Sequence, residues 1–257
     1  NVKKAHAMID CPRYVLKNEN FNFFKHLEWI HAGGAGVEDF INNKFIKSKI
    51  IFTNGKIIQG PEVADHALGL ILSFTRNLYP ISQNISLSKI DRPIEIRNKK
   101  ILIIGLGGIG VNTAERLKAF GAKIDAISND LIPLVSFIDK LYLSDNLNNI
   151  AKNYDIIICA APLTKKTKYM LDYNFFKQMK KNSIFINVSR GKIVKTKDLL
   201  KNSIYKKFRG IGLDVTDPEP LHEDNILKKA PNIFITPHMA GPSDYNRLRG
   251  FELVKEN

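Results

Sequence analysis

The sequence predicts an α/β protein built on a doubly wound parallel β-sheet, with a second, smaller domain. From Lys99 onward, apolar runs of strand length alternate with helical patterns, and such continuous apolar runs are typical of strands buried on both faces. Before Lys99 the rhythm is different, with a Gly-rich loop and one long helix. A chain of 257 residues accommodates one large or two modest domains, and the change of rhythm favours two.

The expected elements follow in a regular order. The segments LEWIHAGG and IIFTN each predict a short strand, and PEVADHALGLILSFTRNL predicts a long helix over residues 61–78, with Pro61 in its first turn, where proline is favoured. A polar stretch, residues 82–98, connects to the α/β repeat. The repeat contains seven predicted strands, at residues 101–104, 123–128, 140–143, 155–161, 183–188, 210–215 and 232–236.

The long helix is more apolar than one buried face requires. Its apolar residues nearly encircle it; they are Ala67, Leu68, Leu70, Ile71, Leu72 and Phe74. We expect a second apolar face to meet either the other domain or a second subunit.

Composition narrows the class of protein. With 44% hydrophobic and 25% charged residues, disordered, collagen-like and disulfide-scaffold classes are excluded. The longest nearly uncharged stretch, residues 101–111, is about half of the ~20 residues that span a bilayer, so no membrane association is expected. Cys11 and Cys159 lack metal-ligand spacing, which predicts reduced thiols in a cytoplasmic protein and no metal site.

The formal net charge of +14 raises the hypothesis of nucleic-acid binding. The lysines are dispersed in small groups along the chain, which favours a solvated basic surface. Nucleic acid is therefore not an expected partner, although the charge can attract small anionic substrates.

A glycine-rich turn follows the first strand of the repeat. Gly105, Gly107 and Gly110 form the pattern GxGxxG between the strand at 101–104 and an amphipathic helical segment. In this context the glycines allow a tight turn and the approach of a pyrophosphate to backbone N–H groups. We predict a Rossmann-type dinucleotide-binding domain; a purely structural turn and a methyltransferase-type loop are the alternatives.

The choice between NAD and NADP stays open. Ser128 and Asn129 occupy the end of the second strand of the repeat, where a carboxylate would hold the ribose hydroxyls of NAD. Asp125 comes too early and Asp130 slightly late, while no arginine follows Ser128 to bind a 2′-phosphate. Neither cofactor is therefore excluded.

Three later strands end in polar residues that suit catalysis. Arg190 follows one strand, Asp214 and Glu219 follow the next, and His238 follows the last. In open α/β sheets the ligand crevice lies beyond the carboxyl ends of the strands, so these side chains can converge on a bound cofactor. His6, His66 and His222 share no motif with the glycine turn or these strand ends and are set aside as non-catalytic.

The chain resembles the D-isomer-specific 2-hydroxyacid dehydrogenase family, including glyoxylate/hydroxypyruvate reductases and phosphoglycerate dehydrogenases. The matching motifs are AGGAGVEDF, VADHALGLIL, GLGGIG, APLTKKTKYML, INVSRGKIV, GLDVTDPEPL and ITPHMAG, in the family's order. The resemblance implies that Arg190 binds the substrate carboxylate and carbonyl, that Glu219 orients His238, and that His238 is the acid/base. It also implies that backbone amides of Ala35 and Gly36 hold the substrate carboxylate.

The resemblance extends to the cofactor site and to the domains. The implied cofactor-binding residues are Gly105, Gly107, Gly108, Ile109, Gly110, Ser128, Ala161, Pro162, Val188, Asp214 and Gly241. We expect a flavodoxin-like substrate domain at residues 1–62, a Rossmann domain at 63–241 and a return segment at 242–257. The family's opening strand and helix are missing, so we expect a truncated substrate domain; a homodimer is also implied.

The residue types fit the chemistry that the resemblance implies. Reducing a 2-oxo acid requires a hydride, a proton donor that titrates near neutrality, and a cation for the developing negative charge; His238 and Arg190 supply the last two. For Asp214, contact with the nicotinamide carboxamide and a simple turn role remain equal alternatives. We predict an NAD(P)-dependent reductase of a small 2-oxo acid, with a nicotinamide-sensing, co-repressor-like binding protein as the alternative.

Overall fold

The computed structural model describes residues 4–10, 24–37, 40, 43–129 and 136–257. The chain forms two compact units. The small unit comprises Asn1–Gln59 and Pro242–Asn257, and the large unit comprises Gly60–Gly241. Within the described residues, no helix is long and apolar enough to cross a membrane.

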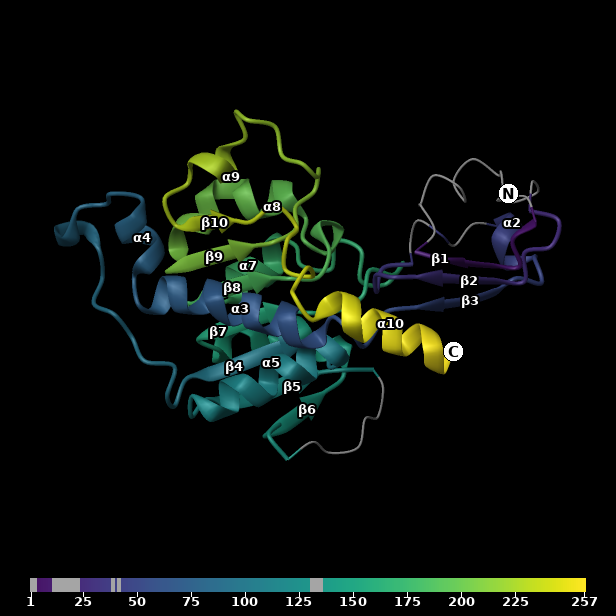
Figure 1. Cartoon of the computed structure of the whole chain (residues 1–257). Coiled ribbons are helices and arrows are strands. Elements are labelled where there is room, and N and C mark those ends of the chain that lie inside the picture. The colour runs from purple at the N-terminus through teal and green to yellow at the C-terminus, as the bar shows by residue number, and fades with distance from the viewer. Residues whose placement is uncertain (1–3, 11–23, 38–39, 41–42, 130–135) are drawn as a thin grey trace. The chain divides into compact units, whose positions relative to one another are not determined.

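A parallel sheet forms the centre of the large unit (Figure 1). Its strands are β4 (Lys100–Ile104), β5 (Lys123–Ile127), β6 (Lys140–Tyr142), β7 (Ile156–Cys159), β8 (Ile184–Asn187), β9 (Gly210–Leu213) and β10 (Ile233–Ile235). They lie in the order β10-β9-β8-β7-β4-β5-β6, with every pairing parallel. Six strands fall within the predicted apolar runs and β4 begins one residue before its run, so the predicted doubly wound α/β fold is confirmed. The order reverses between β4 and β7, the position at which such sheets bind ligands.

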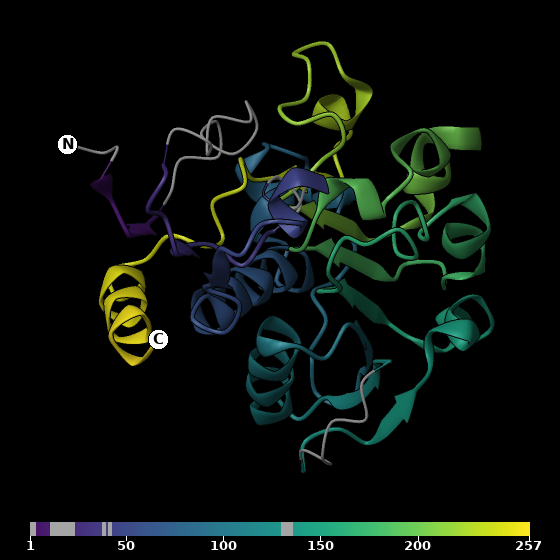
Figure 2. The ribbon, with the colours of Figure 1, turned by 90° about the vertical axis from the view of Figure 1, so that its right-hand side faces the viewer.

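Helices cover both faces of this sheet. One face carries α3 (Gly60–Thr75) and α5 (Gly108–Ala119); the other carries α6 (Leu147–Ile150), α7 (Tyr173–Gln178), α8 (Thr196–Leu200) and α9 (Ile226–Lys229). Because successive strand residues point to opposite faces, Ile101 packs in the core under α3 and α5, whereas Leu102 packs in the core under α7. Figure 2 shows the sheet between the blue and teal helices of the first group and the green helices of the second.

The remaining elements of the large unit are short. Helix α4 (Leu78–Ser82) follows α3, and 3-10 turns cover Leu87–Lys89, Ser144–Asn146, Ala151–Asn153, Gly191–Ile193 and Lys201–Lys207. Tyr79 of α4 stacks on Phe234 of β10 with ring centroids 4.4 Å apart and donates a hydrogen bond to the Ile233 carbonyl. These contacts fix α4 beside the edge strand β10.

Helix α3 differs from the prediction at its C-terminal end. It ends at Thr75 rather than Leu78, because Asn77 adopts a left-handed backbone conformation with φ 60°. The Asn77 side chain donates to the Asp91 carbonyl at 2.7 Å and accepts from Arg209 at 2.8 Å. Contacts with residues remote in the sequence therefore decide where this helix ends.

The apolar residues around α3 pack inside the large unit. Those that are buried there are Ala67, Leu68, Leu70, Ile71 and Phe74, and half-buried Leu72 packs against the same core. Gly210 and Gly212 of β9 let the helix approach closely, since a Cβ on Gly210 would lie 2.2 Å from Cγ of Phe74. The apolarity of α3 thus reflects packing on the sheet and α5, and by itself it gives no reason to expect a second subunit.

At the amino edge of the sheet, Asp155, which directly precedes β7, is bonded to β4 and to the segment before β8. Its carboxylate accepts hydrogen bonds from the Lys100 backbone N–H at 2.9 Å and from Lys180 Nζ at 2.8 Å. Burial alone would raise the pKa of Asp155, but these donors more than compensate and hold its pKa below the ordinary value. The carboxylate therefore stabilises the edge opposite the predicted site.

The small unit contains its own parallel sheet. Strands β1 (Ala7–Ile9), β2 (Trp29–Ala32) and β3 (Ile51–Asn54) lie in the order β1-β2-β3, and the helices are α2 (Asn43–Ile46) and α10 (Asn246–Glu256). Its buried apolar residues are Leu27, Ile30, Ala32, Phe40 and Phe45. The predicted strands β2 and β3 are confirmed. Strand β1 was not predicted, because three residues between polar neighbours are too short for a recognisable pattern.

Candidate active site

The glycine-rich turn joins β4 to α5. Gly105 has φ +97°, and a Cβ there would lie 2.6 Å from the Cα of Ala161. A Cβ on Gly110 would lie 2.1 Å from the Gly105 carbonyl oxygen, whereas a Cβ on Gly107 would meet nothing within 4 Å. Packing of the chain therefore requires two of the three glycines. The third leaves open space before the first turn of α5, where backbone N–H groups favour a phosphate.

The residues around this turn fit a dinucleotide. Gly108 and Ile109 begin α5, a helix long enough to develop a dipole that attracts negative charge. The turn lies between β4 and β7, where the strand order reverses. Both the open side of Gly107 and this location are consistent with a pyrophosphate binding here.

At the end of β5, Ser128 is half-buried and its backbone N–H donates to the Tyr142 carbonyl at 3.1 Å. Asp125 is used inside the fold, where it accepts a 2.7 Å hydrogen bond from the Tyr154 hydroxyl. Burial and this bond raise the pKa of Tyr154 strongly. Asp130 lies outside the described residues, so this strand end leaves the choice between NAD and NADP open.

Three neighbouring strands, β8, β9 and β10, end beside one another at the carboxyl edge. Arg190, Asp214 and His238 follow them. The His238 backbone N–H donates to the Asp214 carbonyl at 2.8 Å. Gly191 packs on the loop after β9, since a Cβ there would lie 1.8 Å from the Thr216 carbonyl oxygen. The three predicted strand-end loops therefore meet in the structure.

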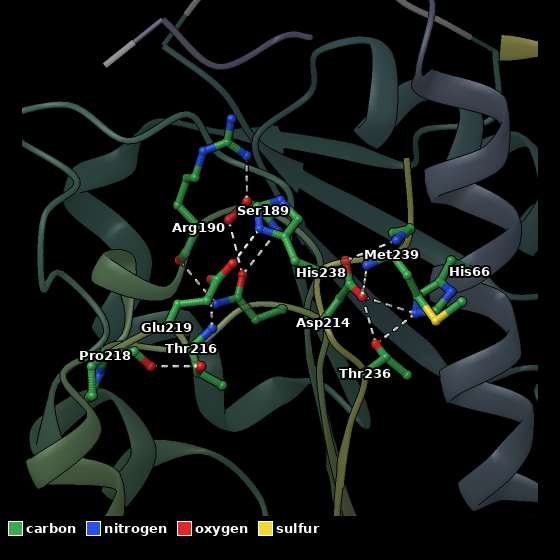
Figure 3. Close-up of polar contacts among 12 residues, drawn as sticks. His66, Ser189, Arg190, Asp214, Thr216, Pro218, Glu219, Thr236, His238 and Met239 are labelled. Carbon is green, nitrogen blue, oxygen red and sulfur yellow. Dashed lines mark hydrogen bonds and ion pairs between the residues drawn. The ribbon is translucent and has the colours of Figure 1, made fainter. Parts of the chain in front are cut away.

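Glu219 and His238 form a direct pair (Figure 3). Nδ1 of His238 lies 2.5 Å from Oε1 of Glu219, and the Thr216 backbone N–H lies 3.4 Å from Oε2 of the same carboxylate. The two side chains are 43% and 39% exposed, so they remain accessible. With Nδ1 engaged, proton exchange with a ligand would occur at Nε2 of the ring.

The loop carrying Arg190 is ordered by Asn187, the last residue of β8. The Asn187 amide donates to the Arg190 carbonyl at 3.1 Å and accepts from the Ser189 N–H and hydroxyl. The Arg190 guanidinium donates to the Ser189 carbonyl at 2.8 Å. Cys159 Sγ lies 3.3 Å from the Ser189 hydroxyl, and burial raises the pKa of this thiol to about 11. A buried, neutral thiol therefore contacts the loop that carries Arg190.

Asp214 is buried, with 2% of its surface exposed. Its Oδ1 accepts from the Thr236 hydroxyl at 2.6 Å and the Met239 N–H at 3.0 Å, and its Oδ2 accepts from the Ala240 N–H at 3.1 Å. His66 of α3 lies 2.9 Å from the Thr236 hydroxyl and 3.4 Å from Oδ1 of Asp214. Figure 3 shows this group of side chains between α3 and the loop of His238.

His66 and Thr236 were missed as site residues from the sequence. His66 was set aside because it shares no motif with the strand ends, and Thr236 was read only as the end of a strand. Their contact spans 170 residues, so no local pattern could have identified it. Asp214 itself was identified, but its bonds to the His238 loop were not.

The other predicted cofactor residues lie at the same edge of the sheet. Ala161 and Pro162 follow β7, Val188 follows β8, and Gly241 closes the large unit. Ala161 packs against Gly105, and the Pro162 carbonyl accepts from the Thr167 hydroxyl at 2.6 Å.

In the small unit, Ala35 and Gly36 follow β2. The Asn54 side chain donates to the Ala35 carbonyl at 2.8 Å and fixes this loop against β3. This bond uses a carbonyl and leaves the backbone amides of the loop outside the contact.

Trp29 and His31 of β2 both contact Thr53 of β3. The indole N–H donates to the Thr53 hydroxyl at 2.9 Å, and Nδ1 of His31 lies 2.9 Å from the same oxygen. Burial lowers the pKa of His31, and Asp10 acts in the opposite direction. Both side chains are therefore part of the packing of the small unit.

A cavity of about 680 Å³ in the large unit reaches the site. Its polar wall includes Asp214, Glu219 and His238, and its apolar wall includes the stacked pair Tyr79 and Phe234. In the part of the chain that the structure describes, no cluster of His, Cys, Asp or Glu could hold a metal ion.

Comparison with protein families gives one match over most of the large unit. Residues 68–240 match the model described as D-isomer specific 2-hydroxyacid dehydrogenase, NAD binding domain. The chain is 32% identical to the glyoxylate reductase of Thermofilum pendens, covering 100% of this chain and 78% of the relative. It is 31% identical to the D-3-phosphoglycerate dehydrogenase of Methanocaldococcus jannaschii, covering 90% of this chain and 44% of the relative.

The fold is also found among solved structures. The D-lactate dehydrogenase of Aquifex aeolicus, complexed with NAD and lactic acid, superposes with a TM-score of 0.79 at 25% identity, covering 99% of this chain and 82% of that one.

Proposed function

Because the chain belongs to the D-isomer-specific 2-hydroxyacid dehydrogenase family, we propose that it reduces a small 2-oxo acid to a D-2-hydroxy acid. It is an NAD(P)-dependent oxidoreductase of 2-hydroxy and 2-oxo acids. The observation that carries the proposal is the 2.5 Å pair of His238 and Glu219 at the carboxyl edge that also holds the glycine-rich turn.

His238 is the proposed proton donor. Reduction of a ketone needs a hydride on carbon and a proton on oxygen, and a bound reduced nicotinamide supplies the hydride. The Glu219 carboxylate engages Nδ1 of His238 and so fixes the orientation of the ring. The proton therefore leaves from Nε2 towards the carbonyl oxygen, and in the reverse direction Nε2 accepts it.

Arg190 is the proposed anion-binding group. Its planar guanidinium can bind a carboxylate through two parallel hydrogen bonds and can also stabilise the negative charge that develops on the reacting oxygen. The hydrogen bonds between Asn187 and the Arg190 loop fix the backbone from which the Arg190 side chain extends. We further propose that the Ala35 and Gly36 amides bind the substrate carboxylate.

The proposed cofactor residues form one set along the carboxyl edge. They are Gly105, Gly107, Gly108, Ile109, Gly110, Ser128, Ala161, Pro162, Val188, Asp214 and Gly241. The open side of Gly107 supports binding of the pyrophosphate there. We assign residues 1–62 and 242–257 to a substrate domain and residues 63–241 to the cofactor domain.

The proposed substrates are glyoxylate and hydroxypyruvate, which is consistent with the similarity to the glyoxylate reductase of Thermofilum pendens. The test follows loss of reduced-cofactor absorbance with glyoxylate, hydroxypyruvate and 3-phosphohydroxypyruvate, each with NADH and NADPH. Turnover that disappears in His238→Ala is the expected result. Cofactor binding without turnover on any of these acids would refute the proposal and favour a nicotinamide-sensing binding protein.

We also propose a homodimer in the cytoplasm. Exposed apolar side chains gather in and after α4, at Leu78, Ile81 and Leu87, and such a surface suits a second copy of the chain. The free, buried thiol of Cys159 is consistent with a reducing compartment. Light scattering after size exclusion should give twice the chain mass, and cell fractionation tests the location.

A further inference from the structure

The loop that carries His238 has a demanding backbone conformation. His238 has φ 53°, a left-handed value that costs an L-residue other than glycine about 1–2 kcal/mol. Its backbone N–H is held by the carbonyls of Asp214 and Thr236, at 2.8 and 3.0 Å. The next two residues, Met239 and Ala240, donate their N–H groups to the Asp214 carboxylate. The position of the imidazole therefore depends on where this buried carboxylate lies.

The Asp214 carboxylate is in turn fixed from the side of α3. A carboxylate only accepts hydrogen bonds, so the single hydroxyl proton of Thr236 is donated to Oδ1 of Asp214. The Thr236 oxygen can then only accept from His66, whose Nε2 lies 2.9 Å away. Nε2 of His66 must therefore carry a proton, and it also lies 3.4 Å from Oδ1 of Asp214.

We propose that His66 and Thr236 are positioning residues for catalysis: the chain of hydrogen bonds from His66 through Thr236 to Asp214 fixes the loop that holds His238. The inference builds on the proposed function, because it assigns partners to the same acid/base residue. It gives α3, which carries none of the site residues predicted from the sequence, a role in positioning the loop of His238.

Paired substitutions test the chain of hydrogen bonds. Thr236→Val keeps the shape and removes the hydroxyl, whereas Thr236→Ser keeps the hydroxyl. His66→Leu removes the donor, whereas His66→Gln keeps an N–H donor of similar reach. Thr75→Val is the matched control, because Thr75 is buried on the same helix and its hydroxyl has no partner among the described residues.

The measured quantities are kcat per cofactor-binding site and KM for the 2-oxo acid. Thr236→Val and His66→Leu should lower kcat roughly 10- to 100-fold, the range for a catalytic group displaced by about 1 Å, with KM changed by less than about twofold. Thr236→Ser and His66→Gln should restore most of kcat, and Thr75→Val should leave it unchanged. Because kcat is counted per binding site, a variant that merely folds poorly does not reproduce this pattern.

A second readout does not depend on activity. Long-range ¹H–¹⁵N NMR of the imidazoles in the protein without substrate should show a proton on Nε2 of His66, and the signal should shift in Thr236→Val. An imidazole protonated only at Nδ1, or unchanged kcat in both Thr236→Val and His66→Leu, would overturn the inference. Absence of wild-type turnover would instead refute the proposed function, and the NMR result would still decide whether the hydrogen-bond chain exists.

Discussion

The pair of Glu219 and His238 gives the sharpest prediction. Glu219→Gln keeps the size of the side chain and removes its charge, so Nδ1 of His238 loses its hydrogen bond to a charged carboxylate. Such bonds contribute about 1.5–3 kcal/mol, and the exposure of 43% and 39% for these two side chains places the loss at the lower end, about 1.5–2 kcal/mol. At 1.4 kcal/mol per factor of ten, kcat should fall roughly 10- to 30-fold.

The assay is steady-state reduction of glyoxylate by the wild type, Glu219→Gln, His238→Ala and the double variant. If Glu219 acts through His238, the glutamine should have almost no further effect once the histidine is absent. Asp217→Asn is the control, because it removes a charge from the same loop but from a carboxylate bonded to the Tyr169 hydroxyl at 2.8 Å. An equal loss from Glu219→Gln in both backgrounds would refute the proposed role of the pair.

Three further predictions concern the scaffold of the site. Gly105→Ala, with φ +97° and a Cβ only 2.6 Å from the backbone of Ala161, should abolish cofactor binding or lower the free energy of unfolding by at least about 2 kcal/mol; unchanged values in cofactor titration and urea unfolding would contradict it. Thr75→Val removes a buried hydroxyl with no partner among the described residues and should raise the free energy of unfolding by about 1 kcal/mol, so a lower urea midpoint would argue against this account. Burial raises the pKa of Cys159 from 9.0 to about 11, so the stability gained by keeping the thiol protonated is complete below pH 9 and is lost as the pH rises towards 11. Thermal unfolding of Cys159→Ala should lose this part of the alkaline dependence, and identical profiles for both proteins would exclude it.

The large unit was predictable because its strands carry local information. Each of the seven strands is an apolar run that can be recognised without knowing its neighbours, and the glycine-rich turn follows the first of them directly. Features decided by distant residues were not predictable. Helix α3 ends early because Asn77 bonds to Arg209, 132 residues away, and three-residue β1 exists only by pairing with β2.

In the candidate site, too, residues within local motifs were predictable and residues that depend on distant contacts were not. Arg190, Glu219 and His238 were identified because each lies in a recognisable motif after a strand, and their catalytic roles remain predictions. His66 lies in the family-like segment VADHALGLIL, but it shares no motif with the glycine-rich turn or the strand ends and was therefore not predicted as a site residue. A hydrogen bond to Thr236, 170 residues further along the chain, becomes visible only in three dimensions.

The hydrogen bonds of Asp155 at the amino edge of the sheet have a practical consequence for work with this protein. The proposed chemistry takes place at the opposite edge, so the two ends of the strands can be altered independently. Lys181 and Asn182, which are exposed beside Lys180, offer a point for attaching a support, a dye or a fused partner at the amino edge of this sheet. A linkage there preserves the bonds from Lys100 and Lys180 to Asp155 and lies away from the strand ends that carry the proposed site.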